Sequence, residues 1–187
     1  SFHPDARLSP AERAELRDYV RSGYDRGHLA PSANMIDEAA QDESFALSNM
    51  VPQDPTNNRY LWSGIESTTR LLAKRSGELF VVTGTIYSTD SLQYIGNRVL
   101  VPTHLYKALY DPKTGEAAAY VTRNDDSPLY ATVTLSELER ITGVQIFPGV
   151  VARARSMELP GPFRRGSKTT VYERVPIASL FDTKLRQ

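Results

Sequence analysis

The sequence predicts an α+β domain in which a mostly antiparallel central sheet is flanked by helices. Three observations support this fold class. Apolar residues recur at helical spacing from Leu61 to Leu72, a β-branched apolar run follows at 79–84, and a turn at 111–115 separates two further apolar runs. The chain has 187 residues, of which 40% are hydrophobic. This length suits a single globular domain over residues 1–187.

The N-terminal elements are predicted from their boundary residues. Ser9 to Glu12 has the form of a capping box with proline at the first helical position, and Leu16, Tyr19 and Val20 continue it as an apolar stripe. We expect this helix to end at Gly23. Residues 27–31 are expected to form a short extended segment, and residues 45–51 a second strand.

The central helix and the strands after it have clearer signals. Asp54 to Thr56 is typical of a turn that starts a helix, and the helix is expected to run to Gly77. Strands are expected at 79–84, 99–101 and 105–110, with the last joined by a hairpin turn to 117–121. A helix over 135–141 would be capped by Thr134 or Ser136 and closed by Gly143. From residue 150 onward we expect mostly loop, with one strand near 169–174.

Composition excludes several classes of chemistry. The chain has no cysteine, which rules out disulfides, cysteine-bound zinc and thiol catalysis. No apolar run approaches the ~18 residues of a membrane span, so we expect no membrane partner. The formal net charge is zero, which argues against binding of polyanions by bulk charge alone. A local basic face remains open, because five cations fall late in the chain: Arg153, Arg155, Arg164, Arg165 and Lys168.

The run Asp25-Arg26-Gly27-His28 is the most informative motif of the chain. A neutral histidine can take a proton from water near neutral pH, so His28 is a candidate general base. Arg26 offers a planar fork of donors that suits phosphate oxygens. Gly27 would let the backbone approach a ligand closely. A lone histidine is more often structural, but these three neighbours favour a role in chemistry.

A second group of polar residues follows on the predicted central helix. Asn58, Trp62 and Glu66 are spaced four residues apart and therefore lie on neighbouring parts of one helix side. An asparagine oxygen can be the sole direct protein ligand of a hydrated magnesium ion, since magnesium keeps several of its waters. Glu66 could accept hydrogen bonds from such waters. Taken alone, Asn58 could equally be a helix cap and Glu66 a solvated carboxylate.

These residues resemble a known family. The motif at 25–28, the segment 48–53 (Ser-Asn-Met-Val-Pro-Gln) and the set Asn58, Trp62 and Glu66 are similar to the DNA/RNA non-specific endonucleases. This family carries the ββα-metal motif, also called the His-Me finger. Segments 101–107 and 141–149 also resemble the corresponding segments of this family. The resemblance covers roughly residues 2 to 150.

The resemblance implies a role for each matched residue. His28 would be the general base, Asn58 the direct metal ligand, and Glu66 would orient metal-bound water. Arg26 would bind the scissile phosphate, and Asn49 would lie close by in the active site. We expect Arg59, next to Asn58, to join Arg26 in substrate binding. Asp25 would anchor the turn.

The implied activity is magnesium-dependent hydrolysis of DNA and RNA, leaving 5′-phosphate and 3′-hydroxyl ends. One hydrated ion would suffice, and manganese could replace magnesium. Activity would fall below about pH 6.5, where an unperturbed histidine becomes charged. One alternative is a nucleic-acid-binding or scaffold member of the same fold with weak catalysis. Another is a phosphodiester hydrolase with a narrow substrate range.

The start of the sequence departs from the family pattern. In the family, further strand structure precedes the segment that matches Phe2 to Asp5, so we expect the family's N-terminal strand segment to be missing here. A separate N-terminal fragment could then complete the sheet. A homodimer is a further expected partner arrangement. A potent unspecific nuclease is usually exported or compartmentalised, and we expect a secreted or periplasmic location rather than a cytoplasmic one.

Other candidate residues have plainer interpretations. His104 lies in a strand-like run, and we expect a structural role for it. The tyrosines of the strands, including Tyr106 and Tyr110, could stack on bases but are better interpreted as sheet packing.

Overall fold

A computed structural model describes residues 1–89, 91–150, 154–164 and 170–181. It confirms the α+β fold class. The main sheet of the described residues has the order β10-β8-β7-β6-β3, and β9 pairs with β7 beside this path. Its strands are β3 (Phe80–Ile86), β6 (His104–Asp111), β7 (Glu116–Arg123), β8 (Leu129–Val133), β9 (Arg155–Ser156) and β10 (Glu173–Arg174). The long pairs are antiparallel, and only the two-residue strands β9 and β10 pair in parallel.

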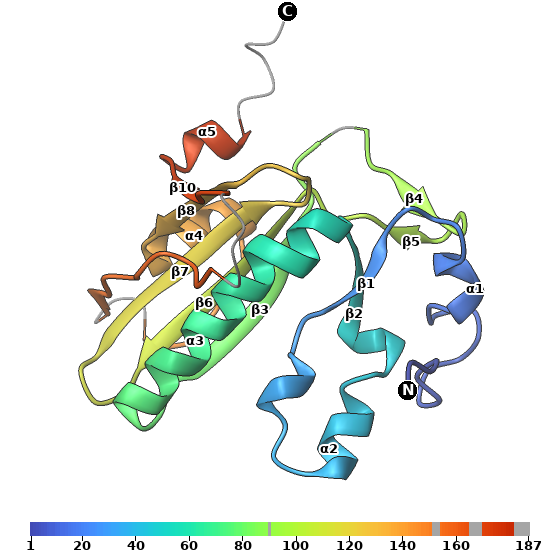
Figure 1. Ribbon diagram of the computed structural model, residues 1–187, viewed down its shortest axis with the longest axis horizontal. Coiled ribbons are helices and arrows are strands. Elements are labelled where there is room, and N and C mark those ends of the chain that lie inside the picture. Colours follow the sequence, from blue (N-terminus) through green and yellow to red (C-terminus); the bar gives the residue numbers. More distant parts are fainter. Residues whose placement is uncertain (90, 151–153, 165–169, 182–187) are drawn as a thin grey trace, which may run out of the picture.

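Helices cover both faces of this sheet (Figure 1). Helix α3 (Ser63–Ser76) packs on one face, where Ile65 meets Leu105 and Leu109 of β6. Helix α4 (Leu135–Thr142) packs on the other face, where Leu138 belongs to the same cluster as Tyr106 and Ala108. The alternation along β6 follows from the two-residue period of a strand. Residue 107 therefore points to the α3 face, although the sequence places a lysine there.

The Asp25-Arg26-Gly27-His28 motif belongs to a separate two-stranded sheet. Strand β1 (Asp25–His28) pairs antiparallel with β2 (Met50–Gln53), with His28 opposite Met50. Figure 1 shows this pair beside the N-terminal end of α3. A third pair, β4 (Tyr94–Ile95) with β5 (Val99–Leu100), is also antiparallel. The connection between β1 and β2 contains η1 (Ser32–Asn34), α2 (Glu38–Glu43) and η2 (Leu47–Asn49).

The central helix has an unusual first part. Residues Asn57–Trp62 form a π-helical segment, η3, that continues directly into α3. Asp54 starts it, since its carboxylate accepts from the backbone N–H groups of Thr56 and Asn57. Gly77 ends α3 with a φ of 85°, as predicted. Single π-turns are found frequently at functional sites, and this one carries Asn58.

Several element predictions are confirmed and others are wrong. The hairpin at 111–115 joins β6 to β7, and Thr134 caps α4 before Gly143 closes it. The predicted strand 45–51 is wrong in its first half: Leu47–Asn49 is a 3-10 turn and the strand begins at Met50. Strand β8 was missed, although Tyr130, Thr132 and Val133 favour a strand. The predicted tail strand is confirmed at 173–174, whereas residue 169 lies outside the described residues.

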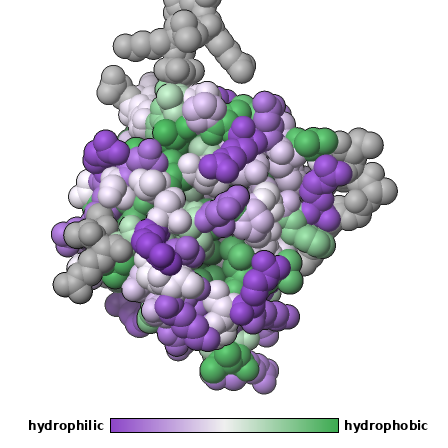
Figure 2. Space-filling model, turned by 90° about the vertical axis from the view of Figure 1, so that its left-hand side faces the viewer, coloured by the Kyte–Doolittle hydropathy of each residue, from purple (hydrophilic) through white to green (hydrophobic). Residues whose placement is uncertain are grey.

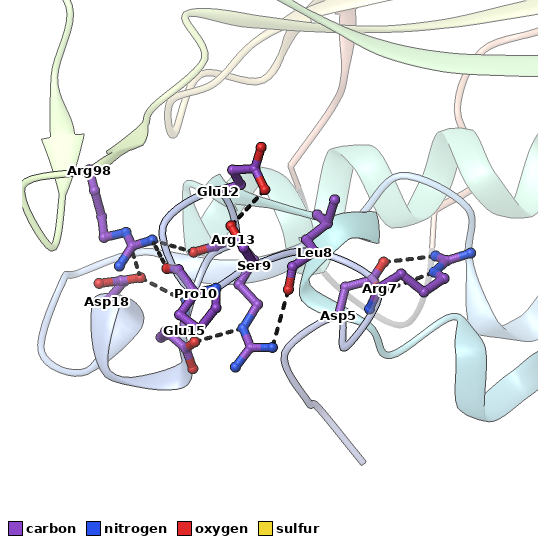
Figure 3. Close-up of polar contacts among 10 residues, drawn as sticks. All are labelled: Asp5, Arg7, Leu8, Ser9, Pro10, Glu12, Arg13, Glu15, Asp18 and Arg98. Atoms are coloured by element: carbon purple, nitrogen blue, oxygen red, sulfur yellow. Dashed lines mark hydrogen bonds and ion pairs between the residues drawn. The ribbon is translucent and has the colours of Figure 1, made fainter.

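The predicted N-terminal helix is also wrong in extent. Helix α1 covers Leu16–Tyr19 alone. The Ser9 hydroxyl donates to the Glu12 carboxylate at 2.6 Å, so these two side chains bond each other and do not cap a helix. Arg98 Nη2 donates to the backbone carbonyls of Pro10 and Arg13 at 2.7 and 2.6 Å (Figure 3). These two carbonyls therefore bond a distant side chain, whereas in a helix they would accept from backbone N–H groups.

The C-terminal part of the chain packs onto the main sheet. Helix α5 (Ala178–Phe181) buries Leu180 in the cluster that contains α4. His104 accounts for part of this contact, because its Nε2 donates to the Leu180 carbonyl at 2.8 Å and its ring stacks on Phe181. The structural role expected for His104 agrees with these contacts.

The face of the molecule in Figure 2 is neither mainly hydrophobic nor mainly hydrophilic. Figure 2 shows hydrophobic and hydrophilic residues interspersed over the face that it presents. Of the late basic residues, Arg155 lies in β9 and Arg164 is exposed, while Arg153, Arg165 and Lys168 lie outside the described residues. None of the described helices is long and apolar enough to cross a membrane.

Candidate active site

The pairing of β1 with β2 explains the glycine of the motif. A Cβ built on Gly27 would clash with the Gln53 side chain, first with its Oε1. Gln53 is fully buried and donates to the Asn57 Oδ1 at 2.7 Å. Asn57 in turn donates to the Arg123 carbonyl at 3.1 Å. Gly27 therefore makes room for a buried amide network that fixes the start of the central helix against β7.

His28 lies in an aromatic surrounding. Its ring centroid is 5.0 Å from that of Phe45, edge-on, and 5.9 Å from that of Phe2. Its Nε2 is buried and has no hydrogen-bond partner among the described residues. Burial lowers the pKa of His28 below its ordinary value of 6.5. The imidazole is therefore neutral at pH 7, as a general base must be.

The N-terminal segment is what brings Phe2 to this position. Asp5 accepts hydrogen bonds from the Arg7 side chain and from the Ser48 hydroxyl, the latter at 2.6 Å. Figure 3 shows the contact between Asp5 and Arg7. The His3 amide donates to the Phe45 carbonyl, and the Leu47 amide donates to the His3 carbonyl. These contacts fasten residues 2–5 to the segment that precedes β2.

Arg26 lies between two aromatic rings. Its guanidinium carbon is 5.1 Å from the Phe2 ring centroid and 5.6 Å from that of Tyr19. Its Nε is buried and has no hydrogen-bond partner within the described part of the chain. A guanidinium held by aromatic faces is positioned without an anionic partner, which leaves its charge available to an anionic ligand.

Asn49 is held by the backbone around the motif. Its side chain accepts from the Ala30 amide at 3.0 Å and donates to the carbonyls of Ala30 and Ser44, both at 2.9 Å. The Leu29 amide also donates to the Asn49 carbonyl. Asn49 therefore shapes the chain directly after His28. The sequence prediction placed it close to the catalytic residues, and these contacts join it to that segment.

Asp25 connects β1 to the central helix. Its carboxylate accepts from Asn58 Nδ2 at 3.0 Å and from Arg59 Nε and Nη2 at 2.9 and 2.7 Å. Burial raises the pKa of Asp25, but the hydrogen bonds from Arg59 and Asn58 outweigh burial and hold it below its usual value. Asp25 thus anchors the start of the central helix. The sequence suggests only that it anchors the turn of its own motif.

The bond to Asp25 orients the Asn58 amide. Because Nδ2 is the donor in this bond, Oδ1 is the atom left to bind a cation. Asn58 is half-buried. No group of three or more histidine, aspartate or glutamate side chains within the described ranges could hold a metal ion. A hard, hydrated divalent ion with few protein ligands fits this donor set.

Glu66 lies on α3 and interacts with the buried Lys107 of β6. The Glu66 carboxylate raises the pKa of Lys107, although burial is the stronger effect and lowers it to about 8. Lys107 Nζ donates to the Thr83 hydroxyl at 2.6 Å and lies 5.3 Å from the Trp62 ring centroid. Lys107 also lines a cavity of about 280 Å³ with residues 29–31 and Asn49. Glu66 is therefore close to a lysine that faces the segment after His28.

The structure joins some of the predicted residues directly. Asn58 and Arg59 donate to Asp25 of β1, and Asn49 bonds the segment after His28. Lys107 lines a cavity with that segment and lies near Trp62, one helical turn before Glu66. Sequence reasoning missed Phe2, Phe45 and Lys107. The lysine had a detectable signal, because a charged residue interrupts the apolar run 105–110.

Comparison with known proteins shows the family to which this chain is similar. Residues 1–153 match the sequence profile of the DNA/RNA non-specific endonuclease family. Mitochondrial endonuclease G of Bos taurus is 36% identical over 176 residues, which cover 84% of this chain and 59% of that protein. Mitochondrial nuclease EXOG of Homo sapiens is 36% identical over 169 residues, covering 79% of this chain and 46% of EXOG. The chain thus spans about half of the length of these relatives.

A solved structure supports the same assignment. The crystal structure of an EndoG/EndoGI complex, which concerns EndoG inhibition, aligns with a TM-score of 0.69 at 33% identity. The alignment covers 79% of this chain and 70% of the other.

The fold and the site define a ββα-metal nuclease architecture. The chain belongs to the DNA/RNA non-specific endonuclease family. The expected secreted or periplasmic location is wrong, because the similar endonuclease G, EXOG and the Schizosaccharomyces pombe nuclease are all named as mitochondrial proteins.

Proposed function

We propose that this chain carries the activity of a magnesium-dependent endonuclease that hydrolyses phosphodiester bonds of DNA and RNA. The observation that carries the proposal is Asp25, which joins the strand of His28 to the amide of Asn58. A neutral base and an oriented oxygen ligand are thereby attached to one rigid pair of elements. Membership of the endonuclease family supports the same activity.

His28 acts as the general base in this proposal. Its Nε2 is buried, which leaves Nδ1 to accept a proton from an attacking water. The lowered pKa keeps the ring neutral before the reaction. The water then attacks phosphorus and the bond to the 3′ oxygen breaks. The departing oxygen takes a proton from a second water, so that the products carry 5′-phosphate and 3′-hydroxyl ends.

Asn58 Oδ1 is the proposed direct ligand of the divalent ion. When bound, magnesium supplies charge stabilisation to the phosphate and the leaving oxygen. Manganese suits the same oxygen donors. Glu66 accepts hydrogen bonds from the water molecules of this hydrated site, and its place on the helix that continues from Asn58 supports this role.

The arginines have different surroundings in this proposal. Arg26 binds the scissile phosphate, because its guanidinium lies among aromatic rings and forms no ion pair with an acidic side chain of the described residues. Arg59 binds an adjacent part of the substrate from the solvent side, where its side chain is 62% exposed. Its Nε and Nη2 are held by Asp25, so we expect a smaller contribution from Arg59 than from Arg26.

Two partner arrangements accompany the proposal. Strand β3 has β6 as its one neighbour in the described sheet, so a separate N-terminal fragment could add to its other edge. A homodimer is the second arrangement. The molecular mass in solution tests both arrangements. A homodimer doubles the mass of the chain, and a bound N-terminal peptide adds its own mass when it is supplied.

Replacement of His28 by alanine tests the activity. The His28→Ala variant should lose plasmid cleavage by at least about a hundredfold, since the base contributes that much or more. Cleavage of plasmid DNA and of RNA is measured with magnesium, with manganese and with a chelator, and circular dichroism checks the fold. His3→Ala is the matched control, because His3 bonds the Ser1 carbonyl near the terminus. Full activity of His28→Ala, or undiminished cleavage in chelator, would reject the assignment.

A further inference from the structure

Lys107 is a buried charge in the middle of an apolar face. Its side chain is 1% exposed, and its neighbours along the same side of β6 are Leu105 and Leu109. Burying an ammonium group without compensation is costly. An apolar residue at this position would complete the cluster that α3 covers, so the lysine requires an explanation other than packing.

The contacts of Lys107 point toward the candidate active site. Its Nζ bonds the Thr83 hydroxyl on β3 and lies near the Trp62 ring at the start of α3. The cavity that it lines is bounded by Leu29, Ala30 and Asn49, the residues that follow and hold the His28 strand. Lys107 therefore lies under the site and faces it through a cavity.

Two charged residues of α3 also act on Lys107. Glu66 and Arg70 are one helical turn apart, and their electrostatic effects on the lysine are opposite in sign. Arg70 donates to the Ser67 hydroxyl at 3.1 Å. The Trp62 ring, 5.3 Å from Lys107 Nζ, lies one helical turn before Glu66. Glu66 is the one acidic residue of α3, so it is the carboxylate that this helix can offer to the buried ammonium. It is also the residue proposed to bind waters of the metal site.

We propose that Lys107 is a positioning residue that holds the Glu66 carboxylate ionised and oriented toward the hydrated metal site. The inference rests on the proposed function and extends it to a residue outside the motif. Lys107 touches neither substrate nor metal, and its effect on cleavage passes through Glu66.

A double-mutant cycle measures this dependence. Lys107→Met keeps the length of the side chain and removes the charge, and it should slow plasmid cleavage by about tenfold or more, with Glu66→Gln slowing it to a similar degree. The double variant should be no slower than Glu66→Gln alone. Lys74→Met is the matched control on the exposed end of α3 and should cleave at the wild-type rate.

A second measurement needs neither metal nor activity. The carboxyl carbon of Glu66, followed by NMR in the metal-free protein, should titrate about one pH unit higher in Lys107→Met than in wild type, because a nearby cation favours the ionised form. Thermal unfolding should show Lys107→Met to be at least as stable as wild type, since methionine suits this apolar position.

The outcomes separate this inference from the proposed function. Full activity of Lys107→Met, additive losses in the double variant, an unchanged Glu66 titration or an unfolded Lys107→Met would each overturn it. If wild type and His28→Ala cleave equally, the proposed function fails, and the Glu66 titration still decides whether Lys107 acts on Glu66.

Discussion

At the scale of single residues, the site depends on groups whose surroundings set their charge. His28 is neutral because burial among aromatic rings lowers its pKa, and Arg26 lies over the Phe2 ring with no ion pair to an acidic side chain in the described part of the chain. Asp25 stays ionised against burial because Arg59 and Asn58 donate to it. Strand β1 thus holds an anionic group at Asp25, a cationic group at Arg26 and a neutral imidazole at His28.

The pH dependence of cleavage follows from the His28 environment. Burial lowers the pKa of the folded-state imidazole, so the neutral form persists below pH 6.5 and activity is lost when pH falls through that lower value. We expect the acidic limb of the kcat/KM profile to have its midpoint below 6.5. This differs from the unperturbed value that the sequence suggested.

Replacement of Phe45 by alanine checks the origin of this shift. Opening the aromatic surrounding should admit water and move the midpoint upward, toward 6.5. The profiles are measured at constant ionic strength, so that screening does not change along the series. A wild-type midpoint at or above 6.5 would contradict burial as the controlling effect.

At the scale of elements, the contact between β1 and the helix start determines whether the metal ligand is in place. The π-helical η3 presents Asn58 and Arg59 together to the Asp25 carboxylate. Gln53 and Asn57 hold the same helix start from its buried side. Two polar networks therefore position one turn of helix.

Removal of the Asp25 charge should weaken metal binding more than folding. Asp25→Asn loses the charged acceptor that orients the Asn58 amide, and we expect the magnesium concentration for half-maximal cleavage to rise about tenfold to a hundredfold. The measurement is a magnesium titration of the cleavage rate. Asp37→Asn, an exposed cap of α2, is the control. An unchanged magnesium requirement in Asp25→Asn would show that Asn58 is oriented by other contacts.

At the scale of the whole molecule, the C-terminal part completes the core of the main sheet. Leu180 is 2% exposed and lies beyond residues 1–153, the part that matches the family profile. His104 and Arg123 donate to the backbone of α5 from the strands. The single domain over residues 1–187 stays a prediction, and these contacts give it a test.

Unfolding measurements test that single domain. Leu180→Ala should lower the free energy of unfolding by about 2–5 kcal/mol, because it leaves a cavity in the main core. Val171→Ala, at a site 65% exposed, should change it by less than about 0.5 kcal/mol. Near- and far-ultraviolet circular dichroism should report one shared transition. Two separate transitions, or no effect of Leu180→Ala, would argue for an independent C-terminal unit.

Much of this protein can be predicted from the sequence because its signals are local. The apolar spacing of α3, the turn at 111–115 and the cap of α4 each depend on neighbours within a few residues. The grouping of Asp25 to His28 is local as well, and it indicates the family without any tertiary contact. Spacing also identified Asn58 and Glu66 as candidates.

The tertiary structure decided what depends on residues far apart in the chain. Phe2 lies near His28 while Asp5 bonds Ser48. Arg98 donates to backbone carbonyls of the segment that follows Ser9. Lys107 lies near the Trp62 ring because the central helix covers that face of the sheet. Each of these contacts joins residues at least 26 positions apart. Local propensity carries no information on such pairs. The motif therefore predicts which residues take part in the chemistry, whereas only the fold shows the distant side chains that set their position and charge.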